Sequence, residues 1–259
     1  MHLNQLSAGH GWVWVKQGLG VFFKQPLAMA GLFFMFMMGI SLLAVIPLVG
    51  TFLAVALVPA GTLGLMAASR EADAGRFPMP LTLLTAFRAG STHSKAMWML
   101  GGLYAAVLLV VMLVSGLLLP TEALQALQGT DVDPEQVRQA LLGPGLLVVA
   151  LLYVPMLAAF WHAPALVHWH GVSPVKALFF SWLACWRNKG AMLVFGLGWL
   201  GIFLLAGLLT SLVAGLLGPQ ALAFVTYPLV LLLAAMFHAS LYFTFRDSFV
   251  THYPTPPST

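Results

Sequence analysis

The sequence predicts an all-α, polytopic membrane protein with six transmembrane helices, and three observations carry this prediction. Hydrophobic residues make up 61% of the 259 residues and charged residues only 7%, with a mean hydropathy of +0.95. Soluble globular domains carry about 25% charged residues, so the composition excludes that class. Six apolar runs are long enough to cross a bilayer, where only helices or closed barrels satisfy the backbone. Ten of the eleven basic residues also lie at the termini or in alternate connections.

The six predicted spans follow one another along the chain. They cover residues 27–46, 48–68, 97–119, 143–167, 191–214 and 219–245. An even number of spans places both termini on the same side of the membrane. We therefore expect one integral membrane domain over residues 1–259.

Residues 1–26 are expected to form a cytoplasmic segment that lies on the membrane surface. They end in FFKQP, contain two lysines among aromatic residues and lack the small-residue pattern of a signal-peptide cleavage site. We interpret them as part of the mature protein.

The distribution of charge predicts the orientation of the spans. Ten of the eleven basic residues and three acidic residues fall on the side of the termini, whereas Arg138 and four acidic residues fall on the other side. Under the positive-inside rule the termini are cytoplasmic. The pI of about 9.5 is then explained by attraction to anionic lipid, and no nucleic-acid partner is expected.

The connection over residues 120–142 is expected to be a periplasmic helical loop. Asp133, Pro134 and Glu135 form a typical helix start, with a capping residue, a proline and an acidic first turn.

Prolines at similar spacing indicate an internal repeat. Pro59 and Pro155 are each followed 19 residues later by another proline, Pro78 and Pro174, and each of these opens a short apolar segment that leads through a basic residue into the next span. The N-terminal FFKQPLAM ends in the same way. We interpret the chain as three tandem units, each an interfacial segment followed by a membrane hairpin.

The segment after Pro174 is predicted to be a helix that lies in the plane of the lipid headgroups. Ser173 is a suitable capping residue and Pro174 suits the first helical position. One face is expected to hold Leu178, Ser181, Trp182 and Cys185. Aromatic and basic side chains suit the interface; those assigned to it are Trp161, Trp169, Lys176, Trp182, Trp186, Arg187 and Lys189. An ordinary loop is the alternative.

The stretch WHAPALVHWHG raises the question of a metal site. On a helix, His162, His168 and His170 do not form the i, i+4 pair that helical zinc sites use, and no acidic or cysteine ligand is close in sequence. The stretch is better interpreted as a helix end, with Trp161 and Trp169 in the aromatic belt and Gly171 as the terminator. No cofactor is predicted, and the lone Cys185 is expected to be an unreactive thiol.

A few residues within or beside the spans are candidates for function. His162 and His238 are the ionisable side chains placed inside spans, where such groups often have a function. Pro59, Pro155 and Pro228 are expected to kink the even-numbered spans, either to line one cavity or only to curve each helix around its neighbour.

Two further features concern contacts between helices or with a partner. Arg246 and Asp247 are expected to form an exposed ion pair of little energetic weight. The small residues Gly207, Ser211 and Gly215 share a face suited to helix contact inside the monomer or between protomers.

Several stretches resemble an uncharacterised family of bacterial inner-membrane proteins found mainly in beta- and gamma-proteobacteria. WHAPALVHWHGVSPVKALFFSWLACWRN is similar to a WFAPALV-type motif of that family, and HASLYFTFRDSF is similar to its YxSYRDIF-type ending. The aromatic, basic N-terminus is similar too, so the resemblance covers nearly the whole chain. It implies a six-span membrane protein with no established activity, and Phe is usual in the family at the position of His162.

Three hypotheses about function follow. The first is a non-catalytic membrane component that organises lipids or a partner membrane protein, as a homo-oligomer or otherwise. The second is a transporter or channel for a small apolar or amphipathic substrate. The third is a membrane enzyme or haem-binding subunit. We favour the first and expect no enzymatic activity, because no nucleophile, zinc or phosphate-loop motif occurs in the sequence.

Overall fold

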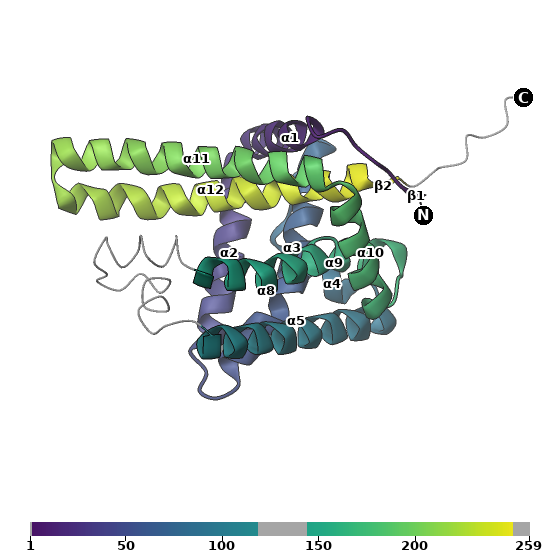
Figure 1. The fold of residues 1–259 in the computed structure, drawn as a ribbon. Helices are drawn as coiled ribbons and strands as arrows, with labels where there is room; N and C mark the ends of the chain where they lie inside the picture. The colour runs from purple at the N-terminus through teal and green to yellow at the C-terminus, as the bar shows by residue number, and fades with distance from the viewer. Residues whose placement is uncertain (1, 119–143, 251–259) are drawn as a thin grey trace, which may run out of the picture.

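The computed structural model describes residues 2–118 and 144–250, which form a helical bundle with one pair of very short strands (Figure 1). Six of its helices are long and apolar enough to cross a membrane, so the prediction of an all-α, six-span protein is confirmed. The long helices are α2 (Pro26–Ala44), α3 (Gly50–Asp73), α5 (Ser91–Leu118), α8 (Pro144–Trp161), α11 (Lys189–Leu217) and α12 (Pro219–Ser248). The tandem repeat and the cytoplasmic termini stay predictions.

The long helices are arranged as three antiparallel pairs, α2 with α3, α5 with α8, and α11 with α12. In Figure 1, α11 and α12 lie side by side and extend well beyond the other helices, while α2 and α3 cross behind. α3 is the most buried long helix and contacts α2, α5 and α12. Proline at the first turn of α2 and of α12 suits a helix start, because the amides there have no intrahelical partner.

A short helical segment precedes each pair and packs against a helix of a different pair. α1 (His10–Lys24) packs on α11 and α12, η1 (Pro80–Leu84) packs on α3, and α10 (Pro174–Arg187) packs on α8. The middle segment is a 3₁₀ helix followed by the single turn α4 (Thr85–Arg88). In the tandem-unit interpretation each segment belongs with the helix pair that follows it in sequence. In the structure each segment packs instead against a pair of another unit.

Two glycines allow α1 to approach the α11–α12 pair closely. A Cβ on Gly11 would lie 2.1 Å from the carbonyl oxygen of Ala191, and one on Gly18 would lie 2.3 Å from the Cβ of Ser240. Between them, Trp14 is fully buried. The N-terminal segment, predicted to lie on the membrane surface, is thus docked on the bundle along one face.

The predicted span 143–167 is not one continuous helix. α8 ends at Trp161 and α9 (Ala163–His170) begins after His162, whose backbone does not continue the helix. Pro164 in the first turn of α9 cannot donate a backbone hydrogen bond, which favours a break here. The predicted terminator is confirmed, because Gly171 ends α9 in the left-handed region with φ of 62°.

α10 is helical as predicted. The side chains that face the bundle are those of Pro174, Ala177, Ser181, Ala184 and Cys185. On the face predicted to hold Leu178, Ser181, Trp182 and Cys185, the two small residues are therefore buried, while Leu178 is half-buried and Trp182 is exposed. Ser173 is the N-cap residue as predicted, although its side chain makes no capping hydrogen bond.

Two further predictions concern the loop 120–142 and the small-residue face of α11. The loop 120–142 lies outside the described residues. Gly207 and Gly215 on α11 have no other atoms near the position of a Cβ, and Ser211 is exposed. The small-residue face of α11 is therefore not used within the described part of the chain.

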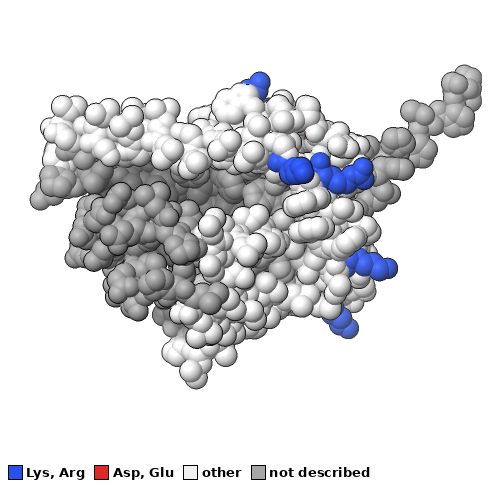
Figure 2. Space-filling model, viewed as in Figure 1, with Lys and Arg blue, Asp and Glu red and all other residues white. Residues whose placement is uncertain are grey.

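Charge is distributed unevenly over the surface. Figure 2 shows Lys and Arg side chains at the side of the molecule where α10 lies and near α1, while the ends of α11 and α12 far from α10 carry none on this face. This distribution agrees with one basic end of the bundle.

Candidate functional site

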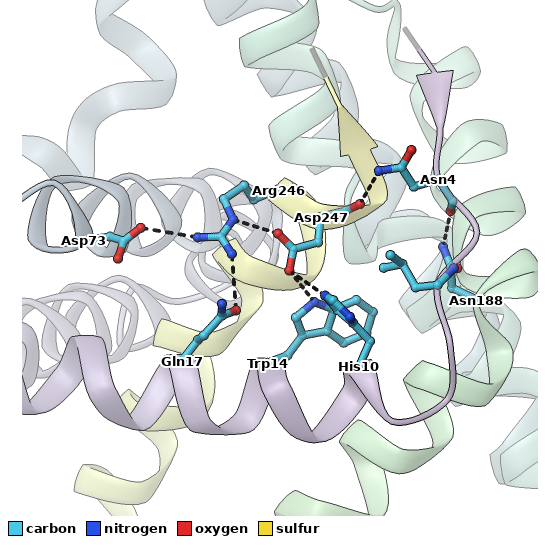
Figure 3. Close-up of polar contacts among 9 residues, drawn as sticks. Asn4, His10, Trp14, Gln17, Asp73, Asn188, Arg246 and Asp247 are labelled. Atoms are coloured by element: carbon cyan, nitrogen blue, oxygen red, sulfur yellow. Dashed lines mark hydrogen bonds and ion pairs between the residues drawn. The ribbon is translucent and has the colours of Figure 1, made fainter. Parts of the chain in front are cut away.

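The C-terminal end of α12 carries a largely buried carboxylate, Asp247, with three polar neighbours (Figure 3). Trp14 Nε1 on α1 donates to Asp247 Oδ2 at 3.0 Å, and His10 Nε2 lies 3.2 Å from the same oxygen. Arg246 Nε donates to Asp247 Oδ1 at 2.8 Å. The Asp247 side chain is only 17% exposed. Both carboxylate oxygens are therefore engaged inside the protein.

Arg246 extends these contacts to two further elements. Its guanidinium lies 3.3 Å from Gln17 Oε1 on α1 and 3.4 Å from Asp73 Oδ2 at the end of α3. Lys24 Nζ, at the end of α1, lies 3.5 Å from Asp73 Oδ1. We name as the Asp247 cluster the residues His10, Trp14, Gln17, Asp73, Arg246 and Asp247.

The N-terminal strand is held beside this cluster. β1 (His2–Leu3) pairs antiparallel with β2 (Phe249–Val250) directly after α12. Asn4 Nδ2 donates to the carbonyl oxygen of Asp247 at 3.1 Å. Asn188, between α10 and α11, accepts from the Leu6 amide at 2.9 Å and donates to the Asn4 carbonyl at 3.0 Å. The Asn188 side chain thus forms hydrogen bonds to the backbone of the N-terminal segment through both its amide oxygen and its amide nitrogen.

These contacts correct the expectation for Arg246 and Asp247. The two residues do form an ion pair, but the pair is partly buried and joined to α1 and α3, not exposed and isolated. Charged hydrogen bonds sheltered from water are stronger than surface pairs. The Asp247 cluster therefore connects the C-terminal end of α12 with α1 and α3.

A second polar group, the His162 cluster, lies at the break between α8 and α9. It comprises Trp161, His162, Ser181, Cys185 and Thr244. The His162 amide, freed by the break, donates to Ser181 Oγ at 2.9 Å, and Ser181 Oγ donates to the Ala158 carbonyl at 2.7 Å. The ring of His162 lies between Thr244 Oγ1 at 3.3 Å and Cys185 Sγ at 3.8 Å. This cluster joins α8, α10 and α12.

The chemistry of the His162 cluster does not suit a nucleophilic cysteine. Burial raises the pKa of the Cys185 thiol to about 12, so the thiol stays protonated at neutral pH. Reactive cysteines have lowered pKa values and lie beside cations in accessible sites. His162 is fully buried as well. Within the described residues there is no group of three or more His, Cys, Asp or Glu residues that could hold a metal ion.

The comparisons with known proteins bear on this architecture as a whole. No family model matches the chain, and no solved structure matches it. A probable inner membrane protein of Burkholderia thailandensis is 36% identical over 266 aligned residues, which cover 99% of this chain and 97% of that protein. The chain belongs to this family of inner-membrane proteins. It is thus a multi-pass protein of the bacterial inner membrane.

The remaining candidates of this inner-membrane protein lie apart from the two clusters. His238 Nδ1 lies 2.8 Å from the carbonyl oxygen of Ala234 one turn earlier, so this nitrogen has its partner within α12. Pro59 is buried in α3, whereas Pro155 and Pro228 are exposed. Pro228 lines an apolar groove of about 240 Å³ with α2 residues, and Pro59 and Pro155 do not line that groove.

The interfacial residues divide into two groups. Trp161 and Trp169, assigned to the aromatic belt, are half-buried and contact other aromatic side chains, Trp161 with Phe195 and Trp169 with Phe245. The others are exposed on α10 or just after it: Lys176, Trp182, Trp186, Arg187 and Lys189.

Sequence reasoning missed most partners in both clusters. Asn4, His10 and Asn188 carried no local signal, because each meets its partner only across more than 180 residues of sequence. One signal was present: an aspartate directly after an apolar span needs donors nearby, and the aromatic, polar N-terminus could supply them.

Proposed function

We propose that the protein is a non-catalytic component of the inner membrane that organises lipids or a partner membrane protein at its basic end. The main observation in support of this proposal is that the partly buried polar side chains connect the short helices to the long ones. Asp247 and Arg246 bind α1 and α3 to the end of α12, and Ser181 binds α10 to α8. These contacts hold the short helices α1 and α10 firmly on the bundle. The basic residues at this end supply the attraction to anionic lipid headgroups that such a role would use.

Native mass spectrometry of the full-length protein, released gently from its own membrane, tests this proposal. We expect a discrete assembly that retains defined lipids or a second protein. A bare monomer that keeps neither would contradict the proposal.

The groove beside Pro228 favours a second candidate function, the passage of a small apolar or amphipathic substrate. Ala30, Phe33 and Phe34 of α2 line it together with Pro228, Leu231 and Leu232 of α12. Uptake of a fluorescent amphipathic cation into proteoliposomes would test this function. Transport along the groove predicts that Pro228→Phe blocks uptake while the same change at the exposed Pro155 does not. The scaffold proposal predicts no uptake above empty liposomes.

A further inference from the structure

α10 carries an exposed aromatic stripe on the face that points away from the bundle. Val175, Phe179, Trp182 and Trp186 follow one another at spacings of four, three and four residues, so they share one side of the helix. Their exposed fractions are 61%, 58%, 39% and 58%. We call these four residues the α10 stripe. The opposite face of α10 is buried against the bundle. The stripe is therefore exposed although the helix itself is well packed.

The two tryptophans of the stripe are ordered against each other. Their rings stack with centroids 5.7 Å apart and an angle of 12° between the planes. Lys189 Nζ lies 5.2 Å from the centre of the Trp186 ring, within the range of a cation–π contact. The aromatic surface is therefore held in place beside a cation.

The cations around the stripe have no acidic counterpart close by. Lys176, Arg187 and Lys189 are all exposed and make no ion pair within the described residues. The sequence contains no Asp or Glu between residues 136 and 246. An apolar stripe bordered by positive charge without nearby acidic residues is complementary to a membrane surface, where negatively charged headgroups cover apolar acyl chains.

We infer that the α10 stripe and its three cations form a binding site for anionic phospholipid. The aromatic side chains enter the boundary between headgroups and acyl chains, where Trp is favoured, and the three cations contact the lipid phosphates. α10 is tethered at both ends to membrane-spanning helices, through α9 and α11, which keeps it at the membrane surface. This inference rests on the proposed organising function and names the lipid class and its site.

The test compares two triple variants of the full-length protein in mild detergent. Lys176→Gln, Arg187→Gln and Lys189→Gln remove the cations beside the stripe. Lys16→Gln, Arg88→Gln and Lys95→Gln remove the same charge at exposed positions on other elements and serve as the matched control. Phosphatidylglycerol or phosphatidylcholine is titrated in, and the bound lipids are counted by native mass spectrometry. We expect the first variant to bind phosphatidylglycerol at least about tenfold more weakly than wild type, because each cation near a lipid surface adds to the attraction.

The control variant should stay close to wild type, and phosphatidylcholine binding should change in neither. A further variant, Trp182→Ser with Trp186→Ser, keeps the charge and removes exposed rings, so it should bind phosphatidylglycerol less tightly without unfolding. Equal binding by wild type and the first variant would overturn the α10 site while leaving lipid organisation elsewhere intact. Wild type with no preference for phosphatidylglycerol would overturn this inference and the lipid part of the proposed function. A second protein that co-purifies with wild type and is lost from the tryptophan variant would make the stripe a protein-docking surface instead.

Discussion

At the scale of single residues, the protein uses a few polar side chains to hold distant segments together. Asp247 accepts hydrogen bonds with both oxygens, and Arg246 reaches α1 and α3 from the same helix end. Removing Asp247 would cost free energy chiefly because the Trp14 indole N–H is fully buried and would lose its acceptor. The contribution of these contacts is therefore measurable by substitution.

Asp247→Ala is expected to lower the free energy of unfolding by about 1–3 kcal/mol, because it leaves the indole N–H of the buried Trp14 without an acceptor. Glu71→Ala is the control. It removes the acidic partner of Arg76 in an exposed pair, which water screens, so the loss of stability should be clearly smaller. The unfolding midpoint in detergent measures both. Equal losses for the two variants would show that the Asp247 cluster is no stronger than a surface pair.

Cys185 makes stability depend on pH in the alkaline range. Its thiol has a pKa of about 12 in the folded protein because of burial, against about 9 when unfolded. Above pH 9 the thiol loses its proton in the unfolded chain but not in the folded protein. The free energy of unfolding is therefore unaffected by this thiol below pH 9, and it decreases by about 1.4 kcal/mol per pH unit from pH 9 to pH 12. Cys185→Ser should remove that part of the slope in unfolding measured between pH 8 and 11. An unchanged slope in the variant would contradict the assignment.

At the scale of elements, the short helices are positioned by close backbone approach as well as by polar contacts. α1 meets α11 at Gly11 and α12 at Gly18, where no side chain fits. Small residues at helix crossings are the usual means of close packing in membranes. The docking of α1 therefore depends on the absence of a methyl group at two positions.

Gly18→Ala tests this dependence. Its methyl group would lie 2.3 Å from the Cβ of Ser240, so α1 must move away, at a cost of about 1–3 kcal/mol. Gly20→Ala, on the same helix, meets nothing within 4 Å and should be neutral or stabilising by up to about 1 kcal/mol from helix propensity. Thermal unfolding and protease cleavage after residue 24 measure both. Destabilisation by Gly20→Ala equal to that by Gly18→Ala would show that packing against α12 is not the cause.

At the scale of the whole molecule, the sequence predicted what depends on the membrane and missed what depends on distant contacts. The six spans follow from hydropathy, because the backbone in lipid must be helical, and Gly171 follows from its freedom to adopt positive φ. Pro164 is a local signal for the break at His162, but the bond of the freed His162 amide to Ser181 was missed because no local pattern reveals that partner. The partners of Asp247 were missed for the same reason, since Trp14 lies 233 residues away in sequence.

Orientation is the property of the whole molecule that the charge distribution predicts most directly. Leu48, between α2 and α3, is fully exposed and lies on the side predicted to be periplasmic, whereas the exposed Ser91 starts α5 on the basic side. The only native thiol, Cys185, is buried and protonated, so it gives little background in labelling with a maleimide. In spheroplasts, a membrane-impermeant maleimide should therefore label Leu48→Cys at once and Ser91→Cys only after permeabilisation. The reverse pattern would place the basic end of the bundle in the periplasm, where α10 would face a leaflet and partners different from those we propose.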